Sequence, residues 1–121
     1  MSFQNNEENA YYSETYIILS LQNFHSPVIN FSPNRYNKLT KITNKIGMLQ
    51  NLKELIVVGN ELTLLPPTLA QIKDLEVMKL EDNPWIEPIE VNRVLSIHHM
   101  MEYLSGNAYS MIYARRSVRL R

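Results

Sequence analysis

Histidines and carboxylates are the side chains of this sequence that could serve in catalysis or metal binding. The three histidines are His25, His98 and His99. Adjacent side chains on a helix point about 100° apart, so His98 and His99 would not easily face one metal ion. Glu81 and Asp82 could act as an acid–base pair, but they are better explained as a solvated rim at the end of a strand. Neither a zinc-binding H-E-x-x-H sequence nor a glycine-rich phosphate loop is present. We therefore expect no enzyme, no metal site, no cofactor and no small-molecule substrate.

Arginines and tyrosines near the C-terminus offer a different chemistry, the binding of anions. No acidic residue follows Glu102, and the chain ends in AYSMIYARRSVRLR, in which Tyr109, Ile112 and Tyr113 precede the arginines. Arginine binds phosphate and carboxylate groups, and aromatic rings can stack on unpaired bases. We predict that residues 105–121 form a basic tail that contacts RNA or an acidic protein; a purely solubilising end is the alternative. The residues expected to make this contact are Tyr113, Arg115, Arg116, Arg119 and Arg121.

The other end of the chain has the opposite charge, although the formal net charge of the whole is zero. Residues 1–34 contain three glutamates and no Lys or Arg, and we expect residues 1–15 to be a flexible acidic segment. This polar start does not resemble a signal peptide, and no apolar run approaches the roughly 20 residues that span a bilayer. The absence of Cys excludes disulfides. We expect about one domain, in the cytoplasm or the nucleus, without membrane contact.

The elements that position these residues follow from an internal repeat. When residues 39–60 are aligned with residues 62–83, eight pattern positions match in succession without a gap. The matched pairs are Leu39 with Leu62, Ile42 with Leu65, Ile46 with Leu69, Leu49 with Ile72, Leu52 with Leu75, Leu55 with Met78, Val57 with Leu80, and Asn60 with Asn83. Chance very rarely produces such a series, so the two segments are successive copies of one structural unit.

The repeat resembles the leucine-rich-repeat family, in its intracellular form of about 23 residues per coil. The residues that carry the resemblance are LKELIVVGNELTLLPPTL and LEVMKLEDNPW. The first reads L-x-x-L-x-L-x-x-N-x-L, and the second has Met78 and Trp85 at two of the leucine positions. The resemblance implies an α/β fold: a short leucine-rich-repeat solenoid with parallel strands on its concave face, a helical or 3-10 convex side, and a C-terminal α-helical cap.

Alternation along each strand predicts which side chains are buried, because successive residues point to opposite faces. The inward residues are Leu55, Val57, Met78 and Leu80. Asn60 and Asn83 should satisfy backbone groups of the turns and connect neighbouring coils. The residues between the inward ones face outward and form an apolar lane edged by charges, which indicates a protein partner. The predicted protein-binding residues of the concave face are Glu54, Ile56, Val58, Val77, Lys79 and Glu81. In the alternative, the N-terminal segment with Tyr11, Tyr12 and Tyr16 folds back over this face.

The segments on either side must complete the core, because about three coils are usually needed. We interpret residues 16–38 as a degenerate coil, with Ile29, Phe31, Asn34 and Tyr36 at pattern positions and a connection three residues longer than the standard; Asn37 fits the strict spacing equally well. Residues 39–61 and 62–85 are the clear repeats. Residues 88–104 should form a capping helix that ends the domain of residues 16–104. The residues at helical spacing in this cap are Val91, Val94, Leu95, His98, Met101 and Leu104.

These features predict a non-enzymatic leucine-rich-repeat binding module, an adaptor or scaffold within a larger assembly. The alternative is a structural or accessory component of a ribonucleoprotein such as a ribosome, anchored on RNA by the arginine-rich tail. Salt separates the two hypotheses. RNA docking should weaken steeply between about 50 and 200 mM salt and should need Arg115 and Arg116, whereas a concave-face contact should tolerate salt.

Overall fold

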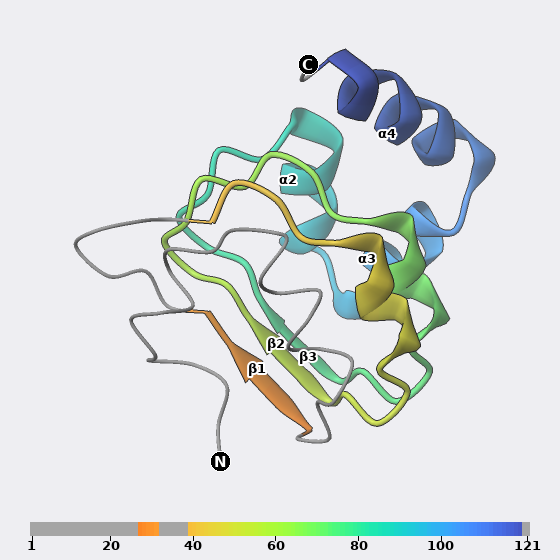
Figure 1. The fold of residues 1–121 in the computed structure, drawn as a ribbon. Helices are drawn as coiled ribbons and strands as arrows, with labels where there is room; N and C mark the ends of the chain where they lie inside the picture. Colours follow the sequence, from red (N-terminus) through yellow and green to blue (C-terminus); the bar gives the residue numbers. More distant parts are fainter. Residues whose placement is uncertain (1–26, 32–38, 120–121) are drawn as a thin grey trace.

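Three short parallel strands form a sheet along one side of the molecule (Figure 1). They are β1 (Val28–Asn30), β2 (Glu54–Ile56) and β3 (Val77–Lys79), and they lie in sequence order. The computed structural model describes residues 27–31 and 39–119, without the side chains of residues 118 and 119. In this part of the chain the protein has a mixed α/β structure, which confirms the predicted fold class at that level.

The strand register follows the repeat found in the sequence. Leu55 of β2 lies opposite Met78 of β3, as the alignment of the two repeats predicts. Ile29 of β1 lies opposite Leu55, and this offset in sequence exceeds that between Leu55 and Met78 by three positions. The longer offset matches the interpretation in which the first connection has three extra residues.

Two 3-10 helices run along the side of the molecule away from the sheet (Figure 1). They are η1 (Asn44–Met48) and η2 (Pro67–Gln71), and they occupy equivalent positions of the two repeats. Gly47 of η1 approaches η2 so closely that an added Cβ atom would lie 2.7 Å from the Cβ atom of Thr68. The absence of a side chain at Gly47 therefore allows η1 and η2 to stack.

Aliphatic side chains fill the space between the sheet and the 3-10 helices. Leu55, Val57 and Leu80 are buried, as the alternation along the strands predicts. Met78 is only half-buried, because β3 is the last strand of the described sheet and no further strand covers it. Other aliphatic residues of the repeats with at most 1% of their surface exposed are Ile29, Ile46, Leu52, Leu62, Leu65, Leu69 and Ile72.

Two asparagines connect the repeats through their side chains. The side-chain oxygen of Asn60 accepts a hydrogen bond from the N–H of Leu39 at 2.8 Å, and that of Asn83 accepts one from the N–H of Leu62 at 3.1 Å. Both amide nitrogens donate to the carbonyl of Val57, at 3.0 and 2.9 Å. The bond from Asn83 to Val57 joins the second clear repeat to the first, and the other three bonds lie within one repeat. The prediction that the asparagines satisfy backbone groups of the turns and connect neighbouring repeats is thus confirmed.

The turn before each of these asparagines also has the same backbone conformation. Gly59 has φ 78° and Asp82 has φ 62°, and each residue directly precedes the linking asparagine of its repeat. This left-handed region costs glycine little but costs residues with a Cβ atom about 1–2 kcal/mol. The second repeat therefore retains the turn of the first although it lacks the glycine.

The helices after β3 differ from the prediction. Instead of the one capping helix expected over residues 88–104, the chain forms α2 (Glu87–Arg93) and α3 (Ile97–Leu104), so the single helix is wrong. Ser96 causes the break: its backbone is extended, and its hydroxyl accepts a hydrogen bond from the N–H of His99 at 3.0 Å as the N-cap of α3. The new helix start changes which residues face the core.

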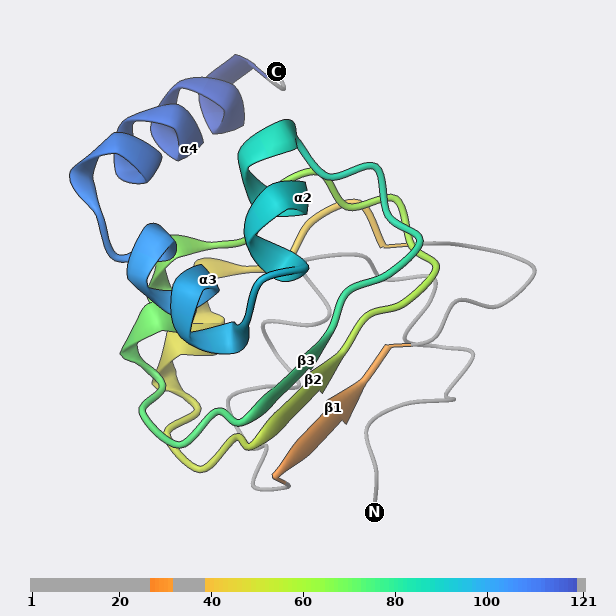
Figure 2. The ribbon, with the colours of Figure 1, turned by 180° about the vertical axis from the view of Figure 1, so that it is seen from behind.

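The apolar face predicted for the cap is consequently wrong in its first half. Val91, Val94 and Leu95 are at least half exposed, and His98 is exposed as well. The residues that α2 and α3 bury are Ile89, Met100 and Leu104. As Figure 2 shows, α2 and α3 follow β3 and cover the end of the molecule beyond it, where α3 packs against η2.

Residues 107–119, expected as part of a tail, form the helix α4 (Asn107–Arg119), which contacts α3 and η2. No helix of the described residues combines the length and the apolar character that a membrane crossing requires. The acidic segment 1–15, the aromatic residues Tyr11, Tyr12 and Tyr16, and the predicted repeat positions Asn34, Tyr36 and Asn37 lie outside the described residues. Those predictions stay predictions.

Candidate functional site

The first candidate site is the outward face of β2 and β3, which we call the strand face. Its residues are the six predicted to bind a protein: Glu54, Ile56, Val58, Val77, Lys79 and Glu81. Glu54, Ile56, Val58 and Val77 are half-buried, and Lys79 and Glu81 are exposed. They alternate with the buried residues of the same strands, so they point away from the core.

The register of the strand face places charged side chains between the apolar ones. Glu54 lies beside Val77, and Lys79 lies beside Ile56. Val77 is therefore a diagonal neighbour of Ile56 rather than its direct partner. The strand face thus offers partly exposed aliphatic groups with acidic and basic groups next to them. That combination can bind another protein through apolar contact and ion pairs.

The second candidate site is α4, and here the structure changes the role of one tyrosine. Tyr109 is fully buried, and its hydroxyl accepts a hydrogen bond from the N–H of Leu65 at 3.0 Å and donates one to the carbonyl of the same residue. Burial raises the pKa of this hydroxyl well above its ordinary value. The expectation that Tyr109 belongs to an exposed basic tail is wrong, because its ring fills a space in the core.

Two further tyrosines surround Tyr109. The ring of Tyr103 on α3 lies 5.1 Å from that of Tyr109, and the ring of Tyr113 on α4 lies 6.1 Å from it, both tilted. Burial also raises the pKa of Tyr103. Tyr113, predicted as a binding residue, is half-buried at the edge of this group. The three tyrosines attach α4 to the rest of the structure.

The two predicted arginines whose side chains are described, Arg115 and Arg116, are exposed on α4. Arg119 lies in α4 but its side chain is not described, and Arg121 lies outside the described residues. Arg115 and Arg116 form no salt bridge with any described residue; the described pair is Glu90 with Arg93, with the carboxylate 2.8 Å from the guanidinium. That pairing lowers the pKa of Glu90.

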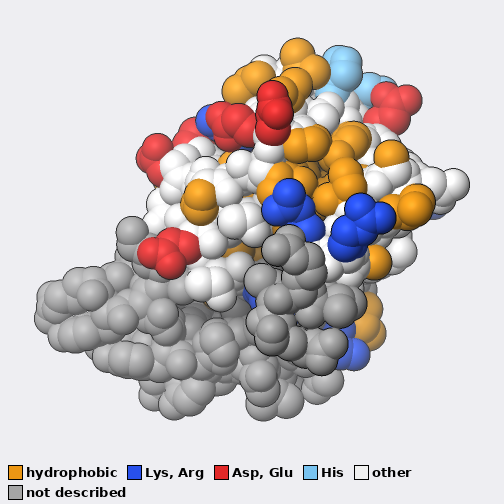
Figure 3. Space-filling view, turned by 90° about the horizontal axis from the view of Figure 1, so that it is seen from above, with side chains coloured by type: hydrophobic (Ala, Val, Ile, Leu, Met, Phe, Trp, Pro, Cys, Tyr) orange, Lys and Arg blue, Asp and Glu red, His pale blue; other side chains and the backbone are white. Residues whose placement is uncertain are grey.

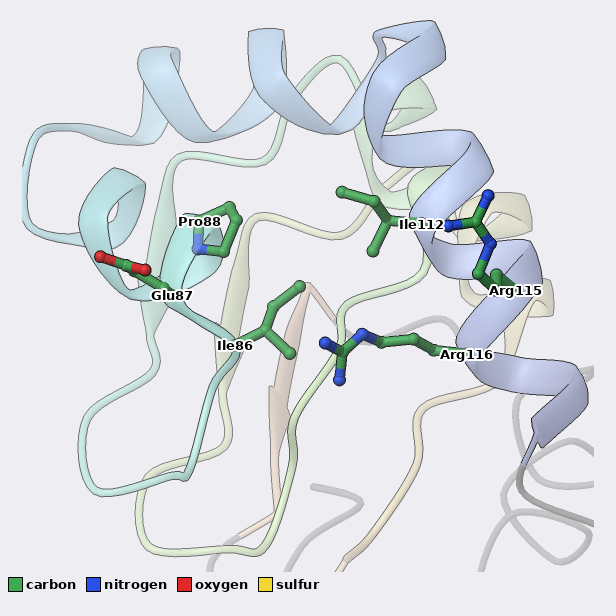
Figure 4. Close-up of a pocket in the computed structure, with 6 residues that line it drawn as sticks. All are labelled: Ile86, Glu87, Pro88, Ile112, Arg115 and Arg116. Carbon is green, nitrogen blue, oxygen red and sulfur yellow. The ribbon is translucent and has the colours of Figure 1, made fainter.

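Arg115 and Arg116 line a hollow between α4 and the start of α2, with a volume of about 370 Å³ (Figure 4). We call it the α2–α4 hollow. Its lining residues are Ile86, Glu87, Pro88, Ile112, Arg115 and Arg116. Figure 3, which views the molecule from this end, shows basic atoms next to apolar ones on the same surface. The sequence identified the arginines, but not the opposite wall of the hollow.

The histidines are arranged differently from a metal site. His98 and His99 are both exposed, with ring centroids 6.2 Å apart and nearly perpendicular planes. The Nδ1 atom of His99 lies 2.7 Å from the hydroxyl of Ser96, the residue that begins α3. Among residues 27–31 and 39–119, no group of three or more His, Cys, Asp or Glu side chains could hold a metal ion.

The sequence analysis missed Ile86, Glu87 and Pro88 of the α2–α4 hollow and the buried position of Tyr109. A signal for α4 was present: Tyr109, Ile112, Tyr113 and Arg116 are spaced three or four residues apart, as on one face of a helix. Nothing local indicates that this face packs against the backbone of Leu65 or approaches Ile86.

Comparison with known proteins gives no family: no family model matches the chain, and no curated protein is significantly similar to it.

Proposed function

We propose that this chain is a short leucine-rich-repeat protein that binds another protein through its strand face. Three independent features support the repeat assignment. The strands of the two clear repeats pair in the register that their sequence alignment predicts, with Leu55 opposite Met78. The side chains of Asn60 and Asn83 each bond to the residue 21 positions earlier. Gly59 and Asp82 give equivalent turns the same left-handed backbone.

One observation carries the proposed binding role: aliphatic side chains stay partly exposed on the side of the sheet that faces away from the described core. Ile56, Val58 and Val77 are half-buried there, although they neighbour the exposed charges of Lys79 and Glu81. Each aliphatic side chain that a partner covers would contribute about 25 cal/mol per Å² of apolar surface removed from water. Lys79 and Glu81 would add charge complementarity and so select the partner.

We further propose that the chain acts by binding and not by catalysis, in the cytosol or the nucleus. Glu81 and Asp82 are exposed beyond the end of β3, as expected of a solvated rim.

The alternative of a ribonucleoprotein component has less support. That function requires arginines and aromatic rings to be exposed together near the C-terminus, so that they can contact phosphates and bases. Tyr109 is fully buried, so its ring cannot stack on a base, and Tyr113 is half-buried beside it. Exposed Arg115 and Arg116 remain available for an anion.

The test is to purify the full chain from its native cells and compare two variants with the wild type. Ile56→Asp puts a charge in the middle of the strand face. Met48→Asp is the matched control, because Met48 of η1 is 71% exposed on the opposite side of the molecule. We expect one protein to accompany the wild type and Met48→Asp, but not Ile56→Asp.

Salt provides the second arm of this test. The strand-face partner should stay bound between about 50 and 200 mM salt, because apolar contact is little screened, whereas RNA should be lost over that range. Thermal unfolding of Ile56→Asp checks that the variant folds. The proposal is wrong if both variants recover the same proteins as the wild type, or if the associated material is RNA that salt removes.

A further inference from the structure

The α2–α4 hollow has two walls that come from separate parts of the sequence. Ile112, Arg115 and Arg116 form one wall, because residues three and four positions apart share a face of a helix. Ile86, Glu87 and Pro88, at the start of α2, form the other wall. The hollow thus combines two cationic groups with apolar side chains, at a volume of about 370 Å³.

Both walls are held in place by contacts outside the hollow. Tyr109 anchors α4 one turn before Ile112, through its hydrogen bonds to the backbone of Leu65. On the other wall, the N–H of Ile86 donates to the carbonyl of Thr63 at 3.1 Å. Pro88 lies in the first turn of α2, where its ring restricts the backbone. The hollow is therefore formed before any ligand arrives, which lowers the cost of binding.

The charges in the hollow favour an anion. Neither Arg115 nor Arg116 forms a salt bridge with a described residue. Figure 4 shows the guanidinium group of Arg116 extending toward Ile86, that of Arg115 pointing in a different direction along α4, and the carboxylate of Glu87 pointing away from α4. Guanidinium groups bind carboxylates through paired, charge-assisted hydrogen bonds, which are stronger than bonds between neutral groups.

We propose that the α2–α4 hollow binds a short acidic and apolar segment of a partner protein. In this complex one carboxylate of the segment pairs with Arg116 and a second pairs with Arg115, and an aliphatic side chain between them packs on Ile86, Pro88 and Ile112. This contact goes beyond the strand face and involves none of its residues. It stands even if the strand face binds nothing.

A peptide fits the α2–α4 hollow better than RNA does. Half of the lining residues are apolar, namely Ile86, Pro88 and Ile112. A groove for single-stranded nucleic acid combines a longer row of cations with exposed aromatic rings on which bases stack. Tyr109 cannot serve as such a ring, because it is fully buried. A carboxylate beside an aliphatic side chain matches both kinds of group that line the hollow.

The experiment measures fluorescence anisotropy of the full chain with a short labelled peptide of alternating Asp and Leu. Two control peptides replace either the Asp residues by Asn or the Leu residues by Ser, and a labelled oligouridine represents RNA. We expect the Asp–Leu peptide to bind more tightly than all three other probes. Arg115→Gln and Arg116→Gln should each weaken its binding by about tenfold, the loss of one charge-assisted hydrogen bond.

Two further variants test whether the peptide binds in the α2–α4 hollow and not elsewhere on the chain. Lys73→Gln removes one exposed positive charge outside the hollow and should leave the affinity unchanged. Ile56→Asp alters the strand face and should also bind the peptide normally, so a failure of one proposal does not affect the other. In methyl NMR spectra the peptide should shift the signals of Ile86 and Ile112.

Several results would overturn the inference. They are the absence of peptide binding up to millimolar concentration, equal losses in Lys73→Gln and Arg116→Gln, and tighter binding of oligouridine than of the peptide. Equal binding of the Asn–Leu peptide would show that Arg115 and Arg116 do not select a carboxylate. Unchanged signals of Ile86 and Ile112 would place the peptide elsewhere on the chain.

Discussion

The hydroxyl of Tyr109 forms hydrogen bonds with both the N–H and the carbonyl of Leu65, although 44 residues separate the two positions. Leu65 belongs to the second clear repeat and precedes η2, whereas Tyr109 lies in the first turns of α4. One side chain thus satisfies two buried backbone groups of the repeats. The first turns of α4 are consequently attached to the core.

The first prediction concerns this pair of bonds. Tyr109→Phe keeps the ring but leaves the N–H and the carbonyl of Leu65 buried without partners, which should lower the free energy of unfolding by about 1–3 kcal/mol. Tyr103→Phe is the control, because its hydroxyl makes no described hydrogen bond and its ring is kept. Urea denaturation followed by circular dichroism measures both variants. Equal stabilities of Tyr109→Phe and the wild type would contradict the structure.

The second prediction is a pH dependence with a definite sign. Burial raises the pKa of Tyr109 above its ordinary value of 10.0, so the folded state keeps a proton that the unfolded state loses in alkaline solution. The stabilisation by Tyr109 should be complete below about pH 10 and should fall above it by at most about 1.4 kcal/mol per pH unit. The difference in unfolding free energy between the wild type and Tyr109→Phe should therefore shrink as the pH rises. A constant difference would mean that the hydroxyl ionises normally in the folded protein.

The third prediction compares the two linking asparagines. Asn60 is buried and its amide also donates to the carbonyl of Phe31 at 2.8 Å, whereas Asn83 is half-buried. Asn60→Ala should cost about 1–3 kcal/mol of stability, and Asn83→Ala less, because water can reach the groups that it leaves unpaired. Asn60→Asp should also destabilise, since a carboxylate cannot donate to Phe31 or Val57. Thermal unfolding of the variants gives the order, and a larger loss at Asn83 would argue against it.

The fourth prediction tests the stacking of η1 on η2. Gly47→Ala places a methyl group 2.7 Å from the Cβ atom and 2.8 Å from the carbonyl oxygen of Thr68, so the 3-10 helices must move apart. We expect a loss of about 1–3 kcal/mol from this overpacking. Gly106→Ala is the matched control, because its Cβ atom would lie 3.5 Å from the nearest described atom, the carbonyl of Tyr103. Calorimetry should find this control within about 0.5 kcal/mol of the wild type.

The repeats could be predicted from the sequence because their pattern of residues recurs at a fixed spacing of 23 positions. Leu55 and Met78 are paired in the sheet as the alignment of the two repeats requires, and Asn60 and Asn83 bond to the turns as expected. Leu55 pairs with the equivalent position of the next repeat, and each asparagine bonds to a carbonyl three positions earlier in its own turn. The pattern therefore contains the information needed to place them.

The helices after β3 were harder to predict, because apolar spacing alone did not reveal where one helix ends. Serine is a favoured N-cap residue, and Ser96 begins α3. A prediction that used this signal would end the first helix before Ser96 and would place Val94 and Leu95 in the exposed connection between α2 and α3. The docking of Tyr109 has no such local signal, since its partner is a backbone group 44 residues away. An arginine-rich sequence is also compatible with either a solvated end or a packed helix, so composition could not decide between them.

The candidate sites divide in the same way. The residues of the strand face could be named from alternation along β2 and β3, and the structure places them on that face. Arg115 and Arg116 could be named from their charge. The α2–α4 hollow could not, because Ile86 and Ile112 come together only after α4 has packed against the repeats.

The hydrogen bond from Leu62 to Asn83 repeats the bond from Leu39 to Asn60, with the same separation in sequence. Each clear repeat therefore supplies one strand, one 3-10 helix and an asparagine that bonds to the start of the same repeat, and the amide of Asn83 also bonds to Val57 of the repeat before it. A duplicated copy of residues 39–61, inserted after residue 61, would lie between two units that share its pattern of aliphatic residues and asparagine. The sheet would then gain one parallel strand for each added copy, and the surface offered to a partner would become wider. The helices α2, α3 and α4 would still cover the end of the sheet beyond β3.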